Sequence, residues 1–253
     1  MIKSVKAVGF DLFNTLITLD STALVEAENR LTAELHAAGL TVEKGLFIDS
    51  HRKWARRFLE GTRKDGRETH NRFWIGAALA DAGHEVDPED PLVAAAVEAY
   101  FSSFVERCRL IPGTIDMLRG LSADYRLGLL SNFTHGPAAR EILNTTGLAE
   151  CFDIVVISGE MGYRKPHRMV FDRLVAELGV SPDETIYIGD DPEPDITGAL
   201  GAGIRPVWTT YVVDRGLPYA PGYMSRESEE DFQIPRISSW DDLKDLLYGL
   251  EKH

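Results

Sequence analysis

The feature that most restricts the fold is an alternation of short apolar runs with helical patterns after residue 110. The runs are rich in aliphatic and β-branched residues, as buried strands are. They cover residues 126–131, 152–157, 185–189 and 204–209. Strands that alternate with helices form a parallel sheet covered by helices on both faces. With one more strand expected at residues 5–11, the sequence predicts an α/β fold with a parallel sheet.

A block without strand patterns separates the first of these strands from the others. Helices are expected near residues 20–39, 42–59, 70–82 and 91–105, where apolar residues recur at helical spacing. Because the block follows the first strand directly, we expect it to form a lobe over the carboxyl end of that strand. The predicted domains are a core of residues 1–16 and 110–253 and an inserted helical lobe of residues 17–109.

Composition restricts the partners of the chain. The formal net charge of -13 argues against nucleic-acid partners and anionic membranes, and the hydrophobic content of 44% suits a packed core. Cys108 and Cys151 have neither metal-binding nor redox spacing, which fits a reducing cytoplasm. No signal peptide and no apolar run of membrane length is seen, so a cytoplasmic protein is expected, as a monomer or homodimer. Residues 211–234, which include an acidic run at 227–231, are expected to be an irregular surface excursion, and residues 239–250 a terminal helix.

Polar residues follow four of the predicted strands or the loops beside them. The stretches are Asp11-x-Phe13-Asn14-Thr15, Ser131-Asn132, Arg164-Lys165-Pro166, and Gly189-Asp190-Asp191 with Asp195. Since parallel strands end at one edge of a sheet, these groups are expected to converge there. Carboxylates bind a divalent cation, whereas lysine and hydroxyl groups bind the oxygens of an anion.

Each stretch also has a plain structural interpretation when it is taken alone. Asp11 can cap a helix, Lys165 can be a solvated side chain, and Asp195 can favour a first helical turn. Their common placement after successive strands argues against coincidence.

The four stretches in this order resemble the motifs of the haloacid dehalogenase superfamily, over about residues 5–209. The resemblance implies a three-layer Rossmann-like core, with residues 17–109 as a helical cap inserted between the first and second motifs. It also implies that Asp11 is a nucleophile that forms a covalent aspartyl intermediate. Thr15, Ser131 and the amide of Asn132 would position the transferred group, and Lys165 would neutralise charge on Asp11 and the substrate.

A metal site is implied by the same resemblance. Mg²⁺ would be bound beside Asp11 by the main-chain carbonyl of Phe13 and the carboxylate of Asp190. Asp191 or Asp195 would complete the metal shell, directly or through water.

Phe13 departs from the pattern of the family's phosphatases, which usually carry a second aspartate there as general acid and base. The phenyl ring cannot transfer a proton, and loss of such a group typically costs about 10² to 10⁴ in rate. Dehalogenases of the family also lack this aspartate, but they generally lack the metal-binding Gly-Asp that is present here as Gly189-Asp190. His135 is a candidate replacement donor, although a solvent-facing loop histidine is the favoured interpretation.

Three functions therefore stay open. The favoured one is a Mg²⁺-dependent phosphatase that acts on a small organic phosphate through an aspartyl-phosphate at Asp11, because clustered acids repel one another unless a cation neutralises them. The second is a 2-haloacid dehalogenase-like hydrolase of carbon–halogen bonds, and the third is a binding or regulatory protein with weak turnover.

One basic stretch in the helical lobe is a candidate binding site for an anionic substrate. Residues 51–58 and 63–74 carry several basic side chains interleaved with aromatic ones. Most of them are expected to form a solvated helix face over an aromatic lobe core. Arg56 is predicted to contact a small-molecule anion, and the patch is too short for nucleic acid.

Overall fold

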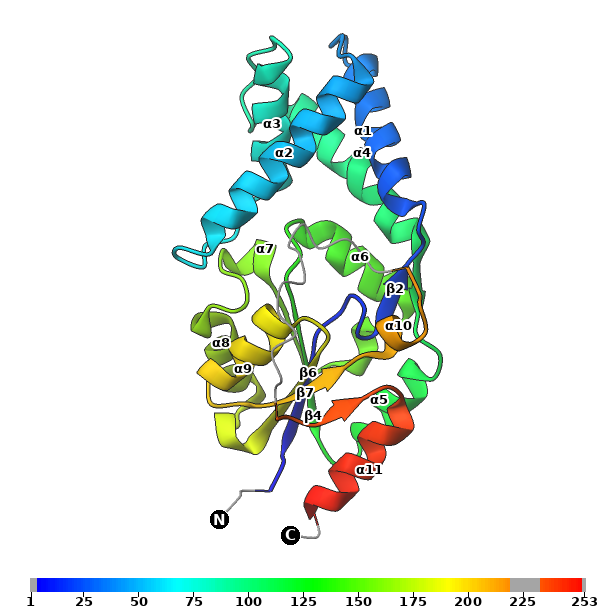
Figure 1. The fold of residues 1–253 in the computed structure, drawn as a ribbon, viewed down its shortest axis with the longest axis vertical. Coiled ribbons are helices and arrows are strands. Elements are labelled where there is room, and N and C mark those ends of the chain that lie inside the picture. Colours follow the sequence, from blue (N-terminus) through cyan, green and yellow to red (C-terminus); the bar gives the residue numbers. More distant parts are fainter. Residues whose placement is uncertain (1–3, 219–232, 252–253) are drawn as a thin grey trace.

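A computed structural model describes residues 4–218 and 233–251. Its main sheet has six strands in the order β5-β4-β1-β6-β7-β8, and every neighbouring pair is parallel (Figure 1). The strands are β1 (Ala7–Phe10), β4 (Arg126–Ser131), β5 (Ile154–Ile157), β6 (Thr185–Gly189), β7 (Arg205–Thr209) and β8 (Arg236–Ile237). The predicted α/β fold with a parallel sheet is confirmed. Because β1 lies between β4 and β6, the residues that follow these three strands meet at one edge.

Helices cover both faces of the sheet, so successive side chains of a central strand are buried on opposite faces. In β1, Val8 and Phe10 belong to one hydrophobic cluster and Ala7 to the other. The first cluster includes side chains of α5 (Thr114–Leu121), α6 (Gly136–Thr146) and α11 (Trp240–Glu251). The second includes those of α8 (Arg168–Leu178) and α9 (Gly198–Gly201). The result is a three-layer core.

The block between β1 and the rest of the core is helical and stands over the edge of the sheet (Figure 1). Its helices are α1 (Ala23–Ala37), α2 (Lys44–Thr62), α3 (Asn71–Asp81) and α4 (Pro91–Arg107). Helix α4 shows how local sequence sets a boundary: the Asp90 carboxylate accepts the N–H of Leu92 at 2.9 Å, and Pro91 occupies a first-turn position.

The two segments that connect the helical block to the core pair with each other. Strands β2 (Ile17–Leu19) and β3 (Cys108–Leu110) form a two-stranded antiparallel ribbon. The sequence did not predict these strands, because three residues are too few for an alternating pattern to emerge.

The segment after β6 departs from a regular α-helix. The structure has a π-helix at Pro192–Thr197, followed by the single turn of α9. The N–H groups of Asp195 and Ile196 both reach the Asp191 carbonyl, at 3.0 and 3.4 Å, which widens the turn. Widened turns of this kind frequently occur at functional sites.

Several short elements complete the described chain. They are α7 (Ser158–Met161), α10 (Tyr211–Asp214) and the 3-10 helices Ala149–Cys151 and Pro182–Glu184. Helix α10 occupies the start of the predicted irregular excursion, and the acidic run at 227–231 lies outside the described residues. Within residues 4–218 and 233–251, no helix combines the length and apolar character that a membrane crossing requires.

Candidate active site

The turn after β1 fixes the position of Asp11. The Asp11 N–H donates to the Ile188 carbonyl at 2.8 Å, so the first residue beyond β1 is still held by β6. Asn14 adopts a left-handed conformation with φ of 58°, which asparagine tolerates better than most residues. The Asn14 N–H bonds to the Ile17 carbonyl at 2.7 Å and closes the turn. Asp11 is thereby presented at the centre of the sheet edge, where it is 7% exposed.

The side chain of Lys165 contacts residues from two of the other polar stretches. Its ammonium Nζ lies 2.6 Å from Asp11 Oδ1, 2.7 Å from Asp195 Oδ1 and 2.8 Å from the Tyr187 hydroxyl. The Tyr187 hydroxyl donates to the Leu130 carbonyl at 2.9 Å, so it accepts from the ammonium group. Lys165 is 2% exposed, and these contacts satisfy a cation that burial would otherwise disfavour.

The side chains of Asn132 and Thr15 form hydrogen bonds with other residues of the site. The side-chain oxygen of Asn132 accepts the Lys165 N–H at 2.8 Å, and its amide nitrogen donates to the Lys165 carbonyl at 3.0 Å. Thr15 is fully buried, and its hydroxyl donates to Asp11 Oδ2 at 3.4 Å. Both residues were predicted to position the transferred group. In the structure the Asn132 amide bonds to the backbone of Lys165 while Asn132 also lines the cavity, and Thr15 bonds to Asp11; their part in positioning the transferred group stays a prediction.

Three buried carboxylates lie together at this edge. One carboxylate oxygen each from Asp11, Asp190 and Asp195 lies within 4.8 Å of the others. Lys165 brings one positive charge to this cluster and pairs with two of its members, Asp11 and Asp195. Burial raises the pKa of Asp11 to about 7, although Lys165 opposes the rise and Asp195 adds to it. Burial alone would lower the pKa of Lys165, but the charges of Asp11 and Asp195 hold it well above its ordinary value.

The chemistry of this cluster fits a hard divalent cation. All its donors are oxygens, which Mg²⁺ prefers over nitrogen and sulfur ligands. A cation would also remove the repulsion between carboxylates that are buried side by side.

Asp195 and Asp191 have further partners. Asp195 Oδ1 contacts Lys165, and its Oδ2 accepts the Asp191 N–H at 3.0 Å. Gly189 permits this arrangement, since a Cβ there would lie 2.3 Å from the Asp195 carboxyl carbon. Asp191 stands outside the three-carboxylate cluster, and its side chain accepts the Glu193 N–H at 3.4 Å. Burial raises the pKa of Asp191 to about 6, with a further contribution from Asp195.

A cavity of about 210 Å³ opens above Asp11, between the sheet edge and the helical block. Ser131, Asn132 and Lys165 line it from the core. Arg56, which was predicted to contact substrate, is exposed and lies outside the lining; Arg63 and Arg164 line the cavity instead. Arg63 directly follows α2, seven residues beyond Arg56 or about 10 Å at the helical rise, at the end of α2 that reaches the core (Figure 1).

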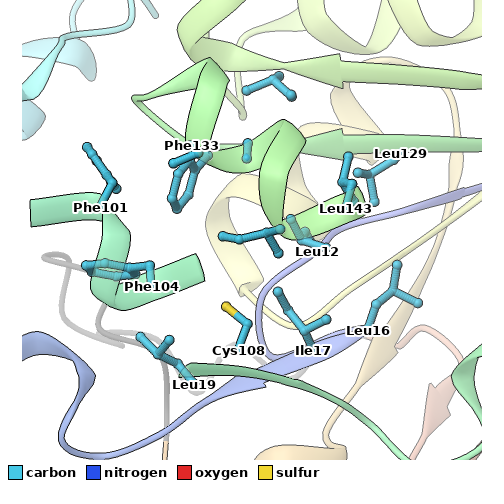
Figure 2. Packing of buried hydrophobic residues seen from close by; sticks show 14 of the residues in the cluster. Leu12, Leu16, Ile17, Leu19, Phe101, Phe104, Cys108, Leu129, Phe133 and Leu143 are labelled. Carbon is cyan, nitrogen blue, oxygen red and sulfur yellow. The ribbon is translucent and has the colours of Figure 1, made fainter. Parts of the chain in front are cut away.

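Phe13 and His135 belong to one aromatic cluster. The Phe13 ring stacks on Phe133 with centroids 5.3 Å apart, and Phe101 of α4 contacts Phe133 at 5.1 Å. Figure 2 shows Phe101 and Phe104 facing Phe133. His135 is buried, stacks on Phe101 at 4.9 Å and places Nε2 3.0 Å from Glu98. The expected solvent-facing position is therefore wrong, and His135 is not part of the cavity lining either.

A short backbone pairing connects the helical block to the segment that precedes Lys165. The Glu68 N–H donates to the Gly162 carbonyl and the Arg164 N–H to the Gly66 carbonyl, both at 2.9 Å. The buried Glu68 carboxylate also accepts hydrogen bonds from Arg164 Nη1 at 2.9 Å and from the Ser158 hydroxyl at 2.5 Å. The position of the helical block is thus tied to the chain that carries Lys165.

We expect the Glu68→Gln variant to loosen this junction. The substitution leaves the Arg164 cation without its carboxylate, which typically costs 2–5 kcal/mol for a buried pair. Hydrogen exchange should accelerate at the amides of Glu68 and Arg164. Glu60→Gln, an exposed site on α2, is the matched control and should leave both amides unchanged. Equal exchange in wild type and Glu68→Gln would show that the ion pair does not hold the junction closed.

Two residues of the site, Tyr187 and Glu68, were not predicted from the sequence. The only signal for Tyr187 is a tyrosine within the apolar strand 185–189, which implies a buried hydroxyl in need of a partner. Glu68 carries no local signal, because its partners Ser158 and Arg164 are about 90 residues away.

Comparison with known proteins matches residues 5–203 to the haloacid dehalogenase-like hydrolases. A glyceraldehyde 3-phosphate phosphatase of Methanopyrus kandleri is 33% identical, over 98% of this chain and 99% of the relative. A pyrimidine 5'-nucleotidase of Escherichia coli is also 33% identical, over 79% of this chain and 83% of the relative.

Solved structures share the fold at lower identity. A 2-haloacid dehalogenase from Pseudomonas syringae superimposes with a TM-score of 0.72 at 23% identity, covering 97% of this chain and 99% of that one. This likeness concerns the fold alone. The family match spans most of the chain, and the family predicted from the four motifs is confirmed: the protein belongs to the haloacid dehalogenase-like hydrolases.

Proposed function

We propose that the protein is a Mg²⁺-dependent phosphatase that acts on a small organic phosphate, with Asp11 as nucleophile. The observation that carries the proposal is the buried cluster of Asp11, Asp190 and Asp195, in which Lys165 pairs with Asp11 and Asp195. Displacement of a halide needs no metal, whereas transfer of a phosphoryl group benefits from one. The full-length similarity to a protein named as a phosphatase supports the same choice.

In the first step, a carboxylate oxygen of Asp11 attacks phosphorus. The bond from phosphorus to the ester oxygen breaks, its electron pair stays on that oxygen, and the oxygen takes a proton from solvent to leave as the alcohol. In the second step, water attacks the phosphorus of the aspartyl-phosphate and regenerates the carboxylate. Lys165 holds Asp11 in place and offsets negative charge, while Asn132 and Tyr187 fix Lys165.

Mg²⁺ would be held by Asp11, the Phe13 carbonyl and Asp190, and it would supply positive charge for the phosphoryl oxygens. Asp195, whose Oδ1 contacts Lys165 and whose Oδ2 accepts the Asp191 N–H, would complete the metal shell directly or through water. Asp191 would also take part through water. We further propose that residues 17–109 act as a cap over a core of residues 1–16 and 110–253, with Arg63 and Arg164 facing the anionic substrate.

Phosphate release from a panel of small organic phosphates tests this function. We expect release with Mg²⁺ and its loss when a chelator is added. Phe13 favours one competing function, hydrolysis of a carbon–halogen bond, so short 2-haloacids belong in the same panel. Halide release that is indifferent to chelator, without phosphate release, would replace the proposed function.

Mg²⁺ binding is expected to tighten as the pH rises from 6 to 8. The pKa of Asp11 is raised to about 7 by burial, so below pH 7 a proton competes with the cation for this carboxylate. The competition weakens binding by up to about tenfold per pH unit below the pKa. Titration calorimetry at both pH values, in buffers of different ionisation enthalpy, measures the affinity and the released proton. The Asp11→Asn variant should lose most of the pH dependence and keep only the smaller part due to Asp191, whose pKa is about 6; if it keeps the full dependence, Asp11 is not the titrating ligand.

A further inference from the structure

The cavity above Asp11 has one polar end and one aromatic wall. The polar end holds Asp11 and Lys165, the aromatic wall consists of Phe13, Phe101, Phe104 and Phe133, and other parts of the lining include polar side chains such as Asn71 and Thr134. The wall is continuous, because Phe133 contacts the other three rings with centroids 5.3, 5.1 and 6.3 Å away. Phe13 is two residues from Asp11, so the wall begins beside the nucleophile.

We propose that the leaving group of the substrate is aromatic, so that the protein hydrolyses aryl phosphates. This inference rests on the proposed phosphatase function and names its substrate class. The phosphoryl group occupies the polar end beside Asp11, and the aryl ring lies against the aromatic wall.

The size of the cavity agrees with one ring and one phosphoryl group. An engineered protein cavity of about 150 Å³ binds benzene. The cavity here is about 210 Å³ and includes the space above Asp11. Aromatic rings that stack or meet edge-to-face gain about 0.5–1.5 kcal/mol beyond the burial of their area.

The side chain of Phe13 also favours an aryl leaving group. The family's usual proton donor at this position is replaced by a phenyl ring, so the leaving oxygen departs without a proton from residue 13. A phenolate suits this departure because phenols have a pKa near 10, as the tyrosine side chain does. The electron pair of the broken bond stays on the phenolate oxygen, which takes its proton from solvent.

The remaining acids of the cavity lining have structural partners. Glu193 Oε2 pairs with Arg63 at 2.9 Å, and the Asp191 side chain accepts the Glu193 N–H. A sugar phosphate would also place hydroxyl groups against the aromatic wall. Each unsatisfied buried hydroxyl costs about 1–3 kcal/mol.

Leaving-group dependence tests the inference in the full-length protein with Mg²⁺. Phenyl phosphate is compared with cyclohexyl phosphate, which has a similar size but an alkoxide leaving group. We expect kcat/KM to be 10²- to 10⁴-fold higher for phenyl phosphate, about the contribution of a general acid. Across substituted phenyl phosphates, kcat/KM should fall steeply as the pKa of the phenol rises. In Phe13→Asp, the gap between the two esters should narrow at least tenfold.

Phe101→Leu keeps the test decisive if Phe13→Asp does not fold. It shortens the aromatic wall away from the nucleophile and should raise KM for phenyl phosphate several-fold with little change in kcat. Phe73→Leu, at a partly exposed ring outside the cavity lining, is the control and should leave KM unchanged. Equal kcat/KM for the phenyl and cyclohexyl esters would overturn the aryl inference and leave the phosphatase function standing. No phosphate from any ester, including 4-nitrophenyl phosphate, would overturn the phosphatase function itself.

Discussion

The Asp11→Asn variant is expected to lose phosphate release by a factor on the order of 10⁴ or more, as enzymes do when they lose a covalent nucleophile. The asparagine amide has nearly the same shape as the carboxylate but cannot form the aspartyl-phosphate. Asp49→Asn, at an exposed position on α2, is the matched control and should retain wild-type activity. Phosphate release within tenfold of wild type in Asp11→Asn would remove Asp11 from the role of nucleophile.

A measurement of stability shows whether this loss of activity arises from unfolding of the variant. The folded-state pKa of Asp11 is raised to about 7, above the unfolded value near 3.9, so the native state binds the extra proton between these values. The contribution of Asp11 to stability therefore falls as the pH rises through this window, in the absence of metal. Asparagine carries no charge, so metal-free Asp11→Asn should unfold at a higher urea concentration than wild type at pH 8.

The Lys165→Met variant is expected to lower the free energy of unfolding by about 3–5 kcal/mol at pH 8, the usual cost of removing one partner from a buried ion pair. Methionine fills much of the space but leaves Asp11 and Asp195 facing each other without a cation. The Tyr187 hydroxyl also loses a donor. Activity should fall as well, because Lys165 contacts the nucleophile at 2.6 Å.

Urea denaturation at two pH values checks this prediction. The destabilisation should shrink at pH 5, where the Asp11 carboxyl, with its pKa already raised to about 7, is neutral in the folded protein. Lys64→Met, at an exposed position beyond α2, should stay within about 0.5 kcal/mol of wild type. An equal loss for Lys165→Met at pH 5 and pH 8 would show that packing, and not charge, explains the role of Lys165.

The sequence was sufficient for the parts of this protein that depend on local pattern. Strands at 126–131 and 185–189 were predicted with the boundaries that the structure shows, since each is a buried run bounded by polar residues. Asp11, Lys165 and Asp195 were placed at one site because each follows a strand or its loop, and in the structure Lys165 contacts both aspartates. The topology of a parallel sheet makes this inference possible from order alone.

Contacts between distant segments could not be predicted in the same way. The face of α2 was recognisable from its spacing, but which turn of the helix lies over Asp11 depends on how the block packs on the core. Arg56 was therefore predicted to contact the substrate, whereas Arg63 is the arginine that lines the cavity from this part of the chain. His135 was expected in solvent because its loop is polar, whereas α4 covers it with Phe101. The strands β2 and β3 pair residues about 90 positions apart and are too short to show a period.

The most direct test of the central claim is the mass of the peptide that contains Asp11 after rapid acid quenching of wild type during turnover of phenyl phosphate with Mg²⁺. The account predicts an added phosphoryl group on Asp11 that forms with Mg²⁺, is absent with chelator and is absent in Asp11→Asn. Phosphate release without any adduct on Asp11, under conditions in which the second step is slow, would contradict it. An ester on Asp11 formed from a 2-haloacid without metal, in a protein that releases no phosphate, would assign the site to carbon–halogen hydrolysis instead.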